Sequence, residues 1–372
     1  MELLSATDAI GPAFARTRSI LIGPGRTGIF LKLALVAALT QPAFFSAVFT
    51  YPLQGAQLAL NNAMQHRHAV QQFSGGSGLA VAGLAIFAVI ALIMLVLWVS
   101  ATYLFCRFRF VLFDLVLYRE GAVGVPWRKY RRQAWRYFGV LFLGMMVFLL
   151  LAAVFAGPAF LHLAHTSVVL ARHGGSANPF ALLGALLPIF VVLFALSLLY
   201  SIFDAIAQDF LLPPIALEDA PIEGAFGRFK NLFAAYPGQT LLYLLLRLVL
   251  GIGLSAVLML AAAVVVGLLA VACGLLGVLL FHLLWTHGIV ARAVFMAAAV
   301  VLPLLVLGVY LCAAVSVYGV IGVFKQSYAL YFYAPRYLEL GRRLDPPNDA
   351  PPVALEVPPP PPLPPLSSPP IW

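Results

Sequence analysis

Long uninterrupted runs of apolar residues, separated by short polar segments, dominate this chain. The runs exceed the roughly 18 residues that mark a membrane-spanning helix. Backbone groups inside lipid must form hydrogen bonds within their own segment, so the runs predict helices, and their lack of alternation excludes a transmembrane barrel. We therefore predict an all-α, polytopic membrane protein with six transmembrane helices, at about residues 29–51, 79–105, 138–161, 181–203, 239–266 and 293–324.

Two of these runs contain features that should interrupt a straight helix. The apolar stretch at residues 239–286 is too long for one helix across a hydrocarbon core of about 30 Å. It could form one span as far as about Val266, followed by a helix that folds into the outer interface. The first span contains Pro42, which should kink it because proline lacks a backbone N–H.

Segments that are both basic and aromatic precede three of the apolar runs, within residues 1–28, 127–138 and 225–236. As helices they place apolar and aromatic side chains on one face, with Lys and Arg beside or opposite that face. In the first segment, Phe14 and its neighbours form the apolar face, and Arg16 and Arg18 flank it. This pattern is typical of helices that lie in the plane of an anionic membrane surface.

The sequence also repeats at an offset of one hundred residues, where Phe110, Leu112, Leu117 and Arg128 match Phe210, Leu212, Leu217 and Arg228. Together with the N-terminal segment, the repeat predicts three units, each an amphipathic helix followed by a transmembrane hairpin. Glycines within the later spans, at Gly251, Gly253, Gly274 and Gly277, are candidates for close helix packing.

Composition and charge place this architecture in a membrane and give it an orientation. The chain is 63% hydrophobic and 9% charged, against about 25% charged residues in a soluble domain. Of its 22 Lys and Arg, Arg67, Arg172 and Arg292 fall on one predicted side and Arg247 falls within a span, so the other 18 share the opposite side. Positive residues stay in the cytoplasm. We therefore expect both termini to be cytoplasmic.

These patterns divide the chain into three parts. Residues 1–28 form an N-terminal cytoplasmic amphipathic segment, and residues 29–340 form the transmembrane domain. Residues 341–372 form a proline-rich cytoplasmic tail that we expect to be disordered or in polyproline II conformation. The tail resembles a ligand for an aromatic groove, but its composition equally fits a terminus with no dedicated protein partner.

Two sets of residues are candidates for function. Basic residues of the surface helices should contact lipid headgroups: Arg128, Lys129, Arg131, Arg132, Arg228 and Lys230. Asp204, Asp209 and Arg247 lie near the inner ends of two spans, where ionisable groups are costly and often functional. Asp204 and Arg247 could pair and fix the helices or could line a polar path, although snorkelling explains them nearly as well. We favour a structural role for both.

Motifs of enzyme chemistry are missing from the sequence. It contains no His-Glu-x-x-His, no Gly-x-Ser-x-Gly, no phosphate-binding loop and no pair of carboxylates within a span. Three cysteines without paired spacing predict neither disulfides nor a metal site. We expect no enzymatic activity, no cofactor and no nucleic-acid partner.

The histidines form a separate pattern, because all seven fall on the predicted outer side: His66, His68, His162, His165, His173, His282 and His287. His66-x-His68 and His162-x-x-His165 could supply metal ligands, or the histidines could sense pH. No Cys, Asp or Glu accompanies them, so we expect no metal site.

Three stretches together resemble a group of uncharacterised bacterial membrane proteins. They are the opening (Ala9-Ile10, Ala13-Phe14 and Phe30-Leu31-Lys32-Leu33), the middle (Ala225-Phe226, Pro237-Gly238-Gln239 and Leu242-Tyr243) and the end, Phe324 to Phe332. That group is similar in layout to the membrane domain attached to some glycerophosphoryl diester phosphodiesterases. The resemblance covers about residues 8–340 and implies a bacterial inner-membrane location. It implies no activity, since the catalytic domain is absent.

Two functions from different classes fit these features. The first is a non-enzymatic membrane scaffold that binds membrane lipids, anionic ones included, or a protein partner through its basic face. The alternative is a passive or secondary transporter of a lipid or small solute, for which repeats and interrupted helices are typical. A polar cavity lined by Gln41, Asp204 and Arg247 would favour the transporter, and a sealed apolar core would oppose it. The sequence specifies neither a substrate nor an oligomeric state.

Overall fold

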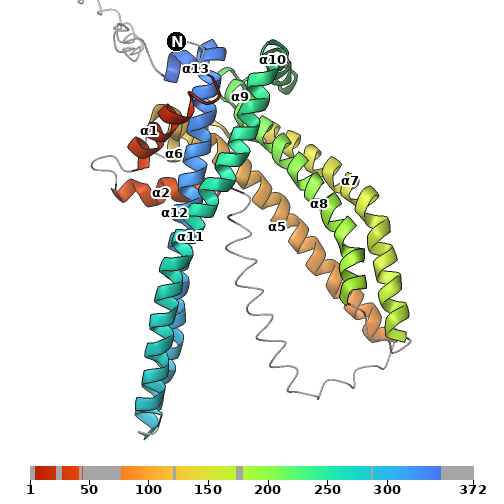
Figure 1. Ribbon diagram of the computed structural model, residues 1–372, viewed down its shortest axis with the longest axis vertical. Coiled ribbons are helices and arrows are strands. Elements are labelled where there is room, and N and C mark those ends of the chain that lie inside the picture. Colours follow the sequence, from red (N-terminus) through yellow and green to blue (C-terminus); the bar gives the residue numbers. More distant parts are fainter. Residues whose placement is uncertain are drawn as a thin grey trace, which may run out of the picture.

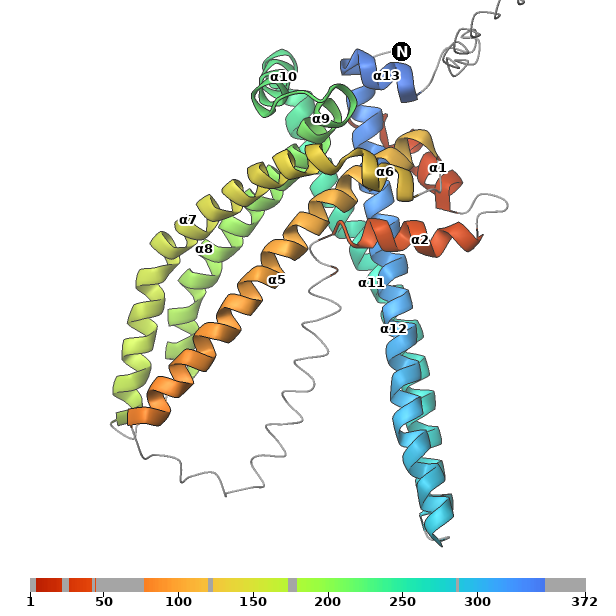
Figure 2. The same ribbon diagram turned by 180° about the vertical axis from the view of Figure 1, so that it is seen from behind.

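The computed structural model describes residues 5–21, 27–41, 44, 77–119, 123–172, 179–285 and 288–344, and within these ranges the regular structure is helical, with no strands. The helices build a head and two legs that diverge from it (Figure 1). One leg contains α5 (Ser77–Tyr118), α7 (Arg131–Arg172) and α8 (Pro179–Ile206). The other contains α11 (Pro237–Leu284) and α12 (Gly288–Tyr333). The view from behind shows the same divergence (Figure 2).

Within the described part of the chain, five helical segments are long and apolar enough to cross a membrane, at residues 91–118, 131–161, 186–218, 237–284 and 288–336. This confirms the expectation of an α-helical membrane protein. In the most apolar part of each segment at most 11% of the residues are buried within the protein. The legs therefore turn nearly all their apolar side chains outward, which is favourable only if lipid or another apolar partner covers them.

The predicted first span, at residues 29–51, takes a different form where it is described. Helix α2 (Thr27–Ala38) has 12 residues, which is about 18 Å of helix and too short to cross a bilayer. It lies across α12 in the head (Figure 1). The two helices can approach this closely because Gly319 of α12 has no side chain. A Cβ atom at this position would lie only 2.6 Å from the Cα of Ala34. Pro42 and all of residues 45–76 lie outside the described residues.

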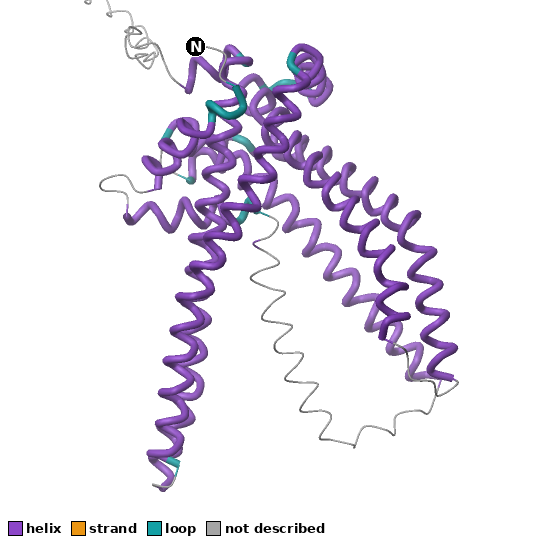
Figure 3. The backbone as a smooth tube through the Cα atoms, in the orientation of Figure 1, coloured by secondary structure: helices purple, strands orange, loops and turns teal. Residues whose placement is uncertain are grey.

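The prediction that residues 239–286 fold back near Val266 is wrong. Helix α11 continues without a break through 48 residues, about 72 Å, and runs antiparallel to α12 along the whole second leg (Figure 3). Its sequence contains no proline after Pro237, so nothing removes a backbone hydrogen bond along its length. The following helix, α12, begins at Gly288, whose φ of +87° favours glycine.

Short helices gather in the head. Two of the three predicted surface segments form short helices there. The N-terminal segment forms α1 (Ile10–Leu21), and the third segment forms α10 (Ile222–Ala235). The middle segment is not one surface helix, because α6 (Gly124–Lys129) ends before Arg131 begins α7. Its aromatic face nevertheless points inward, and Tyr130, Ala134 and Tyr137 are buried in protein instead of lipid.

The rest of the head consists of the π-helical turn η2 (Ala207–Leu211), α9 (Leu212–Glu218), the 3₁₀ turn η3 (Ala334–Arg336) and α13 (Leu338–Leu344). Leu340 and Leu344 of α13 are buried in the core of the head, so the folded part extends to Leu344, beyond the predicted tail boundary at residue 341. The tail from residue 345 onward lies outside the described residues.

Aromatic side chains form the centre of the head. Tyr243 of α11 stacks on Phe332 and Tyr328 of α12, with ring centroids 4.2 and 4.9 Å apart. The repeat-related residues Phe110 and Phe210 are both fully buried. Each meets a tyrosine of the next long helix edge-on at 5.5 Å, Tyr137 for Phe110 and Tyr243 for Phe210. The core therefore joins both legs at one end only.

Candidate functional site

The junction of α8 and α9 places two polar residues inside the head. All five residues of η2 are buried, among them Gln208 and Asp209. Pro213 and Pro214 follow after Leu212, and a proline has no N–H to donate to the carbonyl four residues earlier and clashes with it. The carbonyls concerned belong to Asp209 and Phe210, and the wider π turn accommodates them. The proline pair thus explains why the helix changes register at this point.

Asp209 joins this turn to α11. Its Oδ2 atom lies 2.7 Å from Nε of Arg247 and accepts a hydrogen bond of 2.6 Å from the Tyr243 hydroxyl. Tyr243 and Arg247 are four residues apart on α11 and so share one helix face. A terminal nitrogen of Arg247 also donates to Gln208 Oε1 at 3.3 Å. The buried carboxylate is therefore both charge-paired and hydrogen-bonded, which lowers the free-energy cost of burying it.

A second buried ion pair joins the helices of the first leg. Arg109 of α5 is fully buried and donates to Asp204 Oδ2 of α8 at 2.6 Å. Its other terminal nitrogen donates to the Tyr137 hydroxyl of α7 at 3.0 Å. Because one guanidinium contacts both neighbouring helices, this pair fixes their relative positions.

Two residues of α12 complete what we call the polar layer, which consists of Gln41, Arg109, Asp204, Gln208, Asp209, Arg247, Lys325 and Gln326. Gln326 Oε1 accepts a hydrogen bond from Gln208 at 3.3 Å, and Lys325 donates to Gln41 Oε1 at 3.3 Å. Among the described residues, no carboxylate lies within ion-pair distance of Lys325. The layer therefore holds three cations and two carboxylates, an excess of one positive charge.

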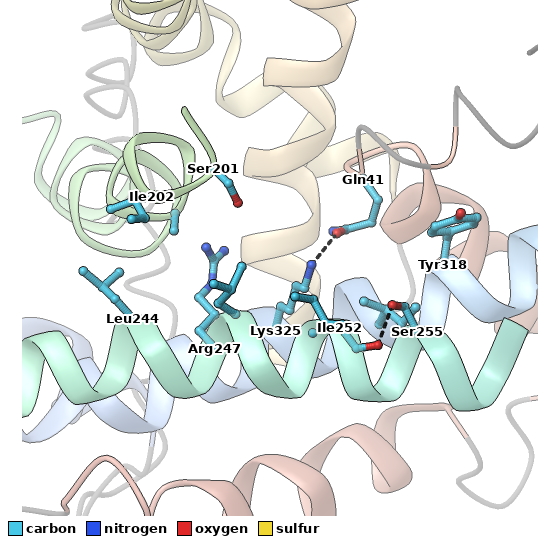
Figure 4. Close-up of a pocket in the computed structure, with 13 residues that line it drawn as sticks. Gln41, Ser201, Ile202, Leu244, Arg247, Ile252, Ser255, Tyr318 and Lys325 are labelled. Atoms are coloured by element: carbon cyan, nitrogen blue, oxygen red, sulfur yellow. Dashed lines mark hydrogen bonds between the residues drawn. The ribbon is translucent and has the colours of Figure 1, made fainter. Parts of the chain in front are cut away.

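A cavity of about 230 Å³ opens beside this unbalanced charge (Figure 4). Arg247 and Lys325 both line it, from adjacent helices, and Figure 4 shows their side chains extending to the same side of α11 and α12. Among the described residues that line the cavity, there is no carboxylate. Its remaining polar lining comes from Gln41, Ser201, Ser255 and Tyr318, and its other walls are apolar or glycine: Ile202, Ala205, Leu244, Leu248, Gly251, Ile252 and Ile321.

The predicted pairing of Asp204 with Arg247 is wrong, because Asp204 binds Arg109 and Arg247 binds Asp209. Asp204 does not line the cavity that Gln41 and Arg247 share, but borders a separate one next to Trp98 and Tyr200. The two acids lie five residues apart, and the π turn between them directs each toward a different leg.

The predicted headgroup residues fall into two groups. Arg228 binds Glu218 at 2.5 Å and donates to the Tyr337 hydroxyl at 3.1 Å, and Lys129 lies 3.3 Å from Asp114. These two residues therefore hold the head together. Burial, with the hydrogen bond to Glu218, raises the pKa of Tyr337. Exposed residues with no ion pair among the described residues form the second group, which we call the basic row: Arg128, Arg131, Arg132 and Lys230.

Arg16 does not reach the surface as expected, although Arg18 is exposed. It is 3% exposed and donates to the carbonyls of Val116 and Leu117 at 2.8 Å. These carbonyls belong to the last turn of α5, where they have no partner within the helix and the helix dipole favours a cation. Phe14, on the predicted apolar face of this segment, is 61% exposed.

Sequence reasoning missed the roles of Arg109, Gln208, Lys325 and Gln326. Arg109 stands between Arg107 and Arg119, and this sequence context is typical of a basic residue at the membrane surface. The long apolar run before Arg109 did contain a signal for its burial. A helix that continues past residue 105 places Arg109 within the same helix, where it can face the protein interior. Lys325 and Gln326 follow an apolar run directly, which is equally typical of a helix that ends at the membrane surface.

The described part of the chain contains no group of three or more His, Cys, Asp or Glu suited to hold a metal ion. His66, His68, His173 and His287, and the side chains of His162 and His165, lie outside the described residues. The cationic cavity suits an anion, because guanidinium and ammonium groups are strong hydrogen-bond donors without acceptors.

Comparison with known proteins places the chain in a family context. A family of unknown function, DUF7544, matches it over residues 4–342. Neither a search of curated proteins nor a search of solved structures gave a match. The similarity in layout to the membrane domain of glycerophosphoryl diester phosphodiesterases stays a prediction.

Proposed function

The chain belongs to the DUF7544 family of unknown function, and we propose that it is a non-enzymatic protein of the bacterial cytoplasmic membrane that binds anionic lipid through its head. The observation that carries this proposal is the basic row. Arg128, Arg131, Arg132 and Lys230 are exposed, while neighbouring Lys129 and Arg228 are engaged in ion pairs. Cations that the head does not use internally are free to bind phosphate groups of lipid.

Helix α10 supports contact with a membrane surface. Its Phe226 and Phe233 are 40% and 43% exposed, and Lys230 is exposed on the same helix. An exposed aromatic ring beside a cation suits the boundary between headgroups and acyl chains, where the ring is buried and the cation meets phosphate. A fully solvated helix would gain nothing from these phenylalanines.

The distribution of charge supports an orientation with the head toward the cytoplasm. The described basic residues at the far ends of the legs are Arg172, which ends α7, and Arg292, near the start of α12. The positive-inside rule then places both termini in the cytoplasm. The predicted first span, at residues 29–51, falls in part on residues that the structure does not describe, so the count of six crossings stays a prediction.

The test compares lipid binding by two triple variants of the full chain in nanodiscs. Arg128→Gln/Arg131→Gln/Arg132→Gln removes three charges of the basic row. Arg18→Gln/Lys32→Gln/Arg342→Gln removes three other exposed charges of the head and is the matched control. Each lost contact should cost about 1 kcal/mol of binding to phosphatidylglycerol. Equal binding by both variants, with topology unchanged in cysteine-labelling experiments, would contradict the proposal.

A second candidate function is passive or secondary transport of a lipid or small solute. The cavity favours it, because Gln41 and Arg247 line it as that hypothesis required, although Asp204 does not. The two legs argue against transport. Few residues in their apolar parts are buried, so the described helices of each leg enclose little space through which a solute could pass. Reconstituted protein that moves fluorescent phospholipid between leaflets, faster than an Arg247→Gln variant, would favour transport over a scaffold.

A further inference from the structure

The excess positive charge of the polar layer has no counterion among the described residues. Arg247 is neutralised by Asp209 and Arg109 by Asp204, whereas Lys325 has only the amide oxygen of Gln41. The charges of Arg247 and Arg109 repel Lys325, while those of Asp204 and Asp209, each already paired with an arginine, attract it. An uncompensated charge in a low-dielectric environment is strongly destabilising unless a ligand balances it. The cavity is where such a ligand would touch both cations.

We propose that this cavity binds the phosphate group of a membrane phospholipid, held between Arg247 of α11 and Lys325 of α12. A phosphate oxygen accepts charge-assisted hydrogen bonds from both side chains, and its negative charge balances the layer. Gln41 orients the Lys325 ammonium group through its side-chain oxygen. The site is separate from the basic row and does not require that the row bind lipid.

The size and lining of the cavity favour a lipid over a soluble phosphate. Its volume of about 230 Å³ corresponds to about eight water molecules at about 30 Å³ each, enough for a phosphate and its ester oxygens but not for acyl chains. The chains must then lie outside it. Beyond its walls, α11 exposes Leu241, Leu245 and Val249, and α8 exposes Phe194 and Leu198. These surfaces suit acyl chains and would not attract inorganic phosphate.

Basic pockets between transmembrane helices are a recognised type of lipid site on the cytoplasmic side of a membrane. Here the cationic groups come from both helices of the second leg, while Ser201 and Ile202 come from α8 of the first. A lipid bound in this cavity therefore contacts both legs where they meet the head, and its binding should also stabilise the angle between them.

The experiment measures binding of phosphatidylglycerol to the delipidated full-length protein by native mass spectrometry. Lys325→Met removes the charge that has no carboxylate partner, so this variant leaves no buried acid unpaired. Loss of a charge-assisted hydrogen bond predicts about tenfold weaker binding or more. Lys325→Arg retains the charge and should bind within a few-fold of the natural chain, because guanidinium groups also bind phosphate.

A steric variant tests the site without changing its charge. Gly251 lines the cavity, and a Cβ atom placed on it would lie 2.9 Å from Cε of Lys325, so Gly251→Leu should fill the space and block the phosphate. Gly253 stands two residues further on, with nothing within 4 Å of its Cβ position, and Gly253→Leu is the matched control. We expect weaker lipid binding for Gly251→Leu only.

The outcomes separate the sources of phosphate. Weaker phosphatidylglycerol binding by Lys325→Met and Gly251→Leu, with normal binding by Gly253→Leu and by the triple variant of the basic row, supports the proposal. Unchanged binding by Lys325→Met and Gly251→Leu, with thermal stability retained, overturns it. Displacement of the lipid by glycerol 3-phosphate or inorganic phosphate at comparable concentrations overturns the lipid assignment, because it shows a site for soluble phosphate.

Discussion

Arg109 and Asp204 form an ion pair of 2.6 Å in which the arginine is completely buried. It joins α5 to α8 at the height where the first leg enters the head. A second pair, Arg247 with Asp209, joins η2 to α11 of the other leg. The two pairs connect α8 and the turn that follows it to both legs, and so help to fix the arrangement of the helices at the head.

Breaking the first pair from one side should destabilise the protein strongly. Asp204→Asn leaves Arg109 buried and unpaired, at a cost of about 3–5 kcal/mol in the free energy of unfolding. The control is Asp219→Asn, which breaks the exposed pair of Arg136 with Asp219 and should cost at most about 1 kcal/mol. Thermal unfolding of the purified protein in detergent measures both. Similar unfolding midpoints for the two variants would show that the buried pair stabilises the protein no more than the exposed pair does.

The crossing of α2 over α12 depends on glycine. A Cβ atom on Gly319 would lie 2.6 Å from Ala34 Cα, and one on Gly322 would lie 2.8 Å from Ala37 O, both backbone atoms that cannot move independently. Gly319→Leu should therefore displace α2 and lower the unfolding temperature by several degrees. Gly308→Leu lies on the same helix with nothing within 4 Å and should leave the unfolding temperature unchanged. A larger loss of unfolding temperature for Gly308→Leu than for Gly319→Leu would contradict the close crossing of α2 over α12.

Arg16 should protect the end of α5 from local opening. Arg16→Met removes its hydrogen bonds to the carbonyls of Val116 and Leu117, which stay buried without a partner at a cost of about 1–3 kcal/mol. We expect faster amide hydrogen exchange in the last turns of α5, measured by mass spectrometry. The exposed neighbour Arg18 serves as control, since Arg18→Met should leave that exchange as it is.

The unbroken course of α11 can be tested by cross-linking. A Cβ atom on Gly277 would lie 4.0 Å from Cδ1 of Leu302, across the second leg. In a chain whose native cysteines are replaced by alanine, Gly277→Cys/Leu302→Cys should form an oxidative or short bifunctional cross-link. Gly253→Cys/Leu302→Cys should not, because residue 253 lies near the head. Absence of the first cross-link would favour a helix that folds back near Val266.

How far the sequence predicts this protein depends on the kind of contact involved. Continuous apolar runs predicted the long helices, because backbone satisfaction in lipid leaves no other structure for such runs. The helical face of Tyr130, Ala134 and Tyr137 was predicted as apolar and is buried. Periodicity specified the face but not its partner, which is the core of the head and not lipid. In the same way, Arg16 would lie beside an apolar face whether that face met lipid or the protein core. Only its contact with α5 shows that it is buried in protein.

The sequence by itself determined the helical membrane class, the extent of the apolar segments and the segregation of positive charge, since each follows from local composition and the cost of burying polar groups in hydrocarbon. Only the tertiary structure decided which acid meets which arginine, that α2 crosses α12, and that Arg247 and Lys325 face one cavity. Contacts of this kind join residues far apart in the chain, such as Gln41 and Lys325, which are 284 positions apart. Their geometry depends on glycine crossings and one π turn, where a change of a single residue redirects every side chain that follows.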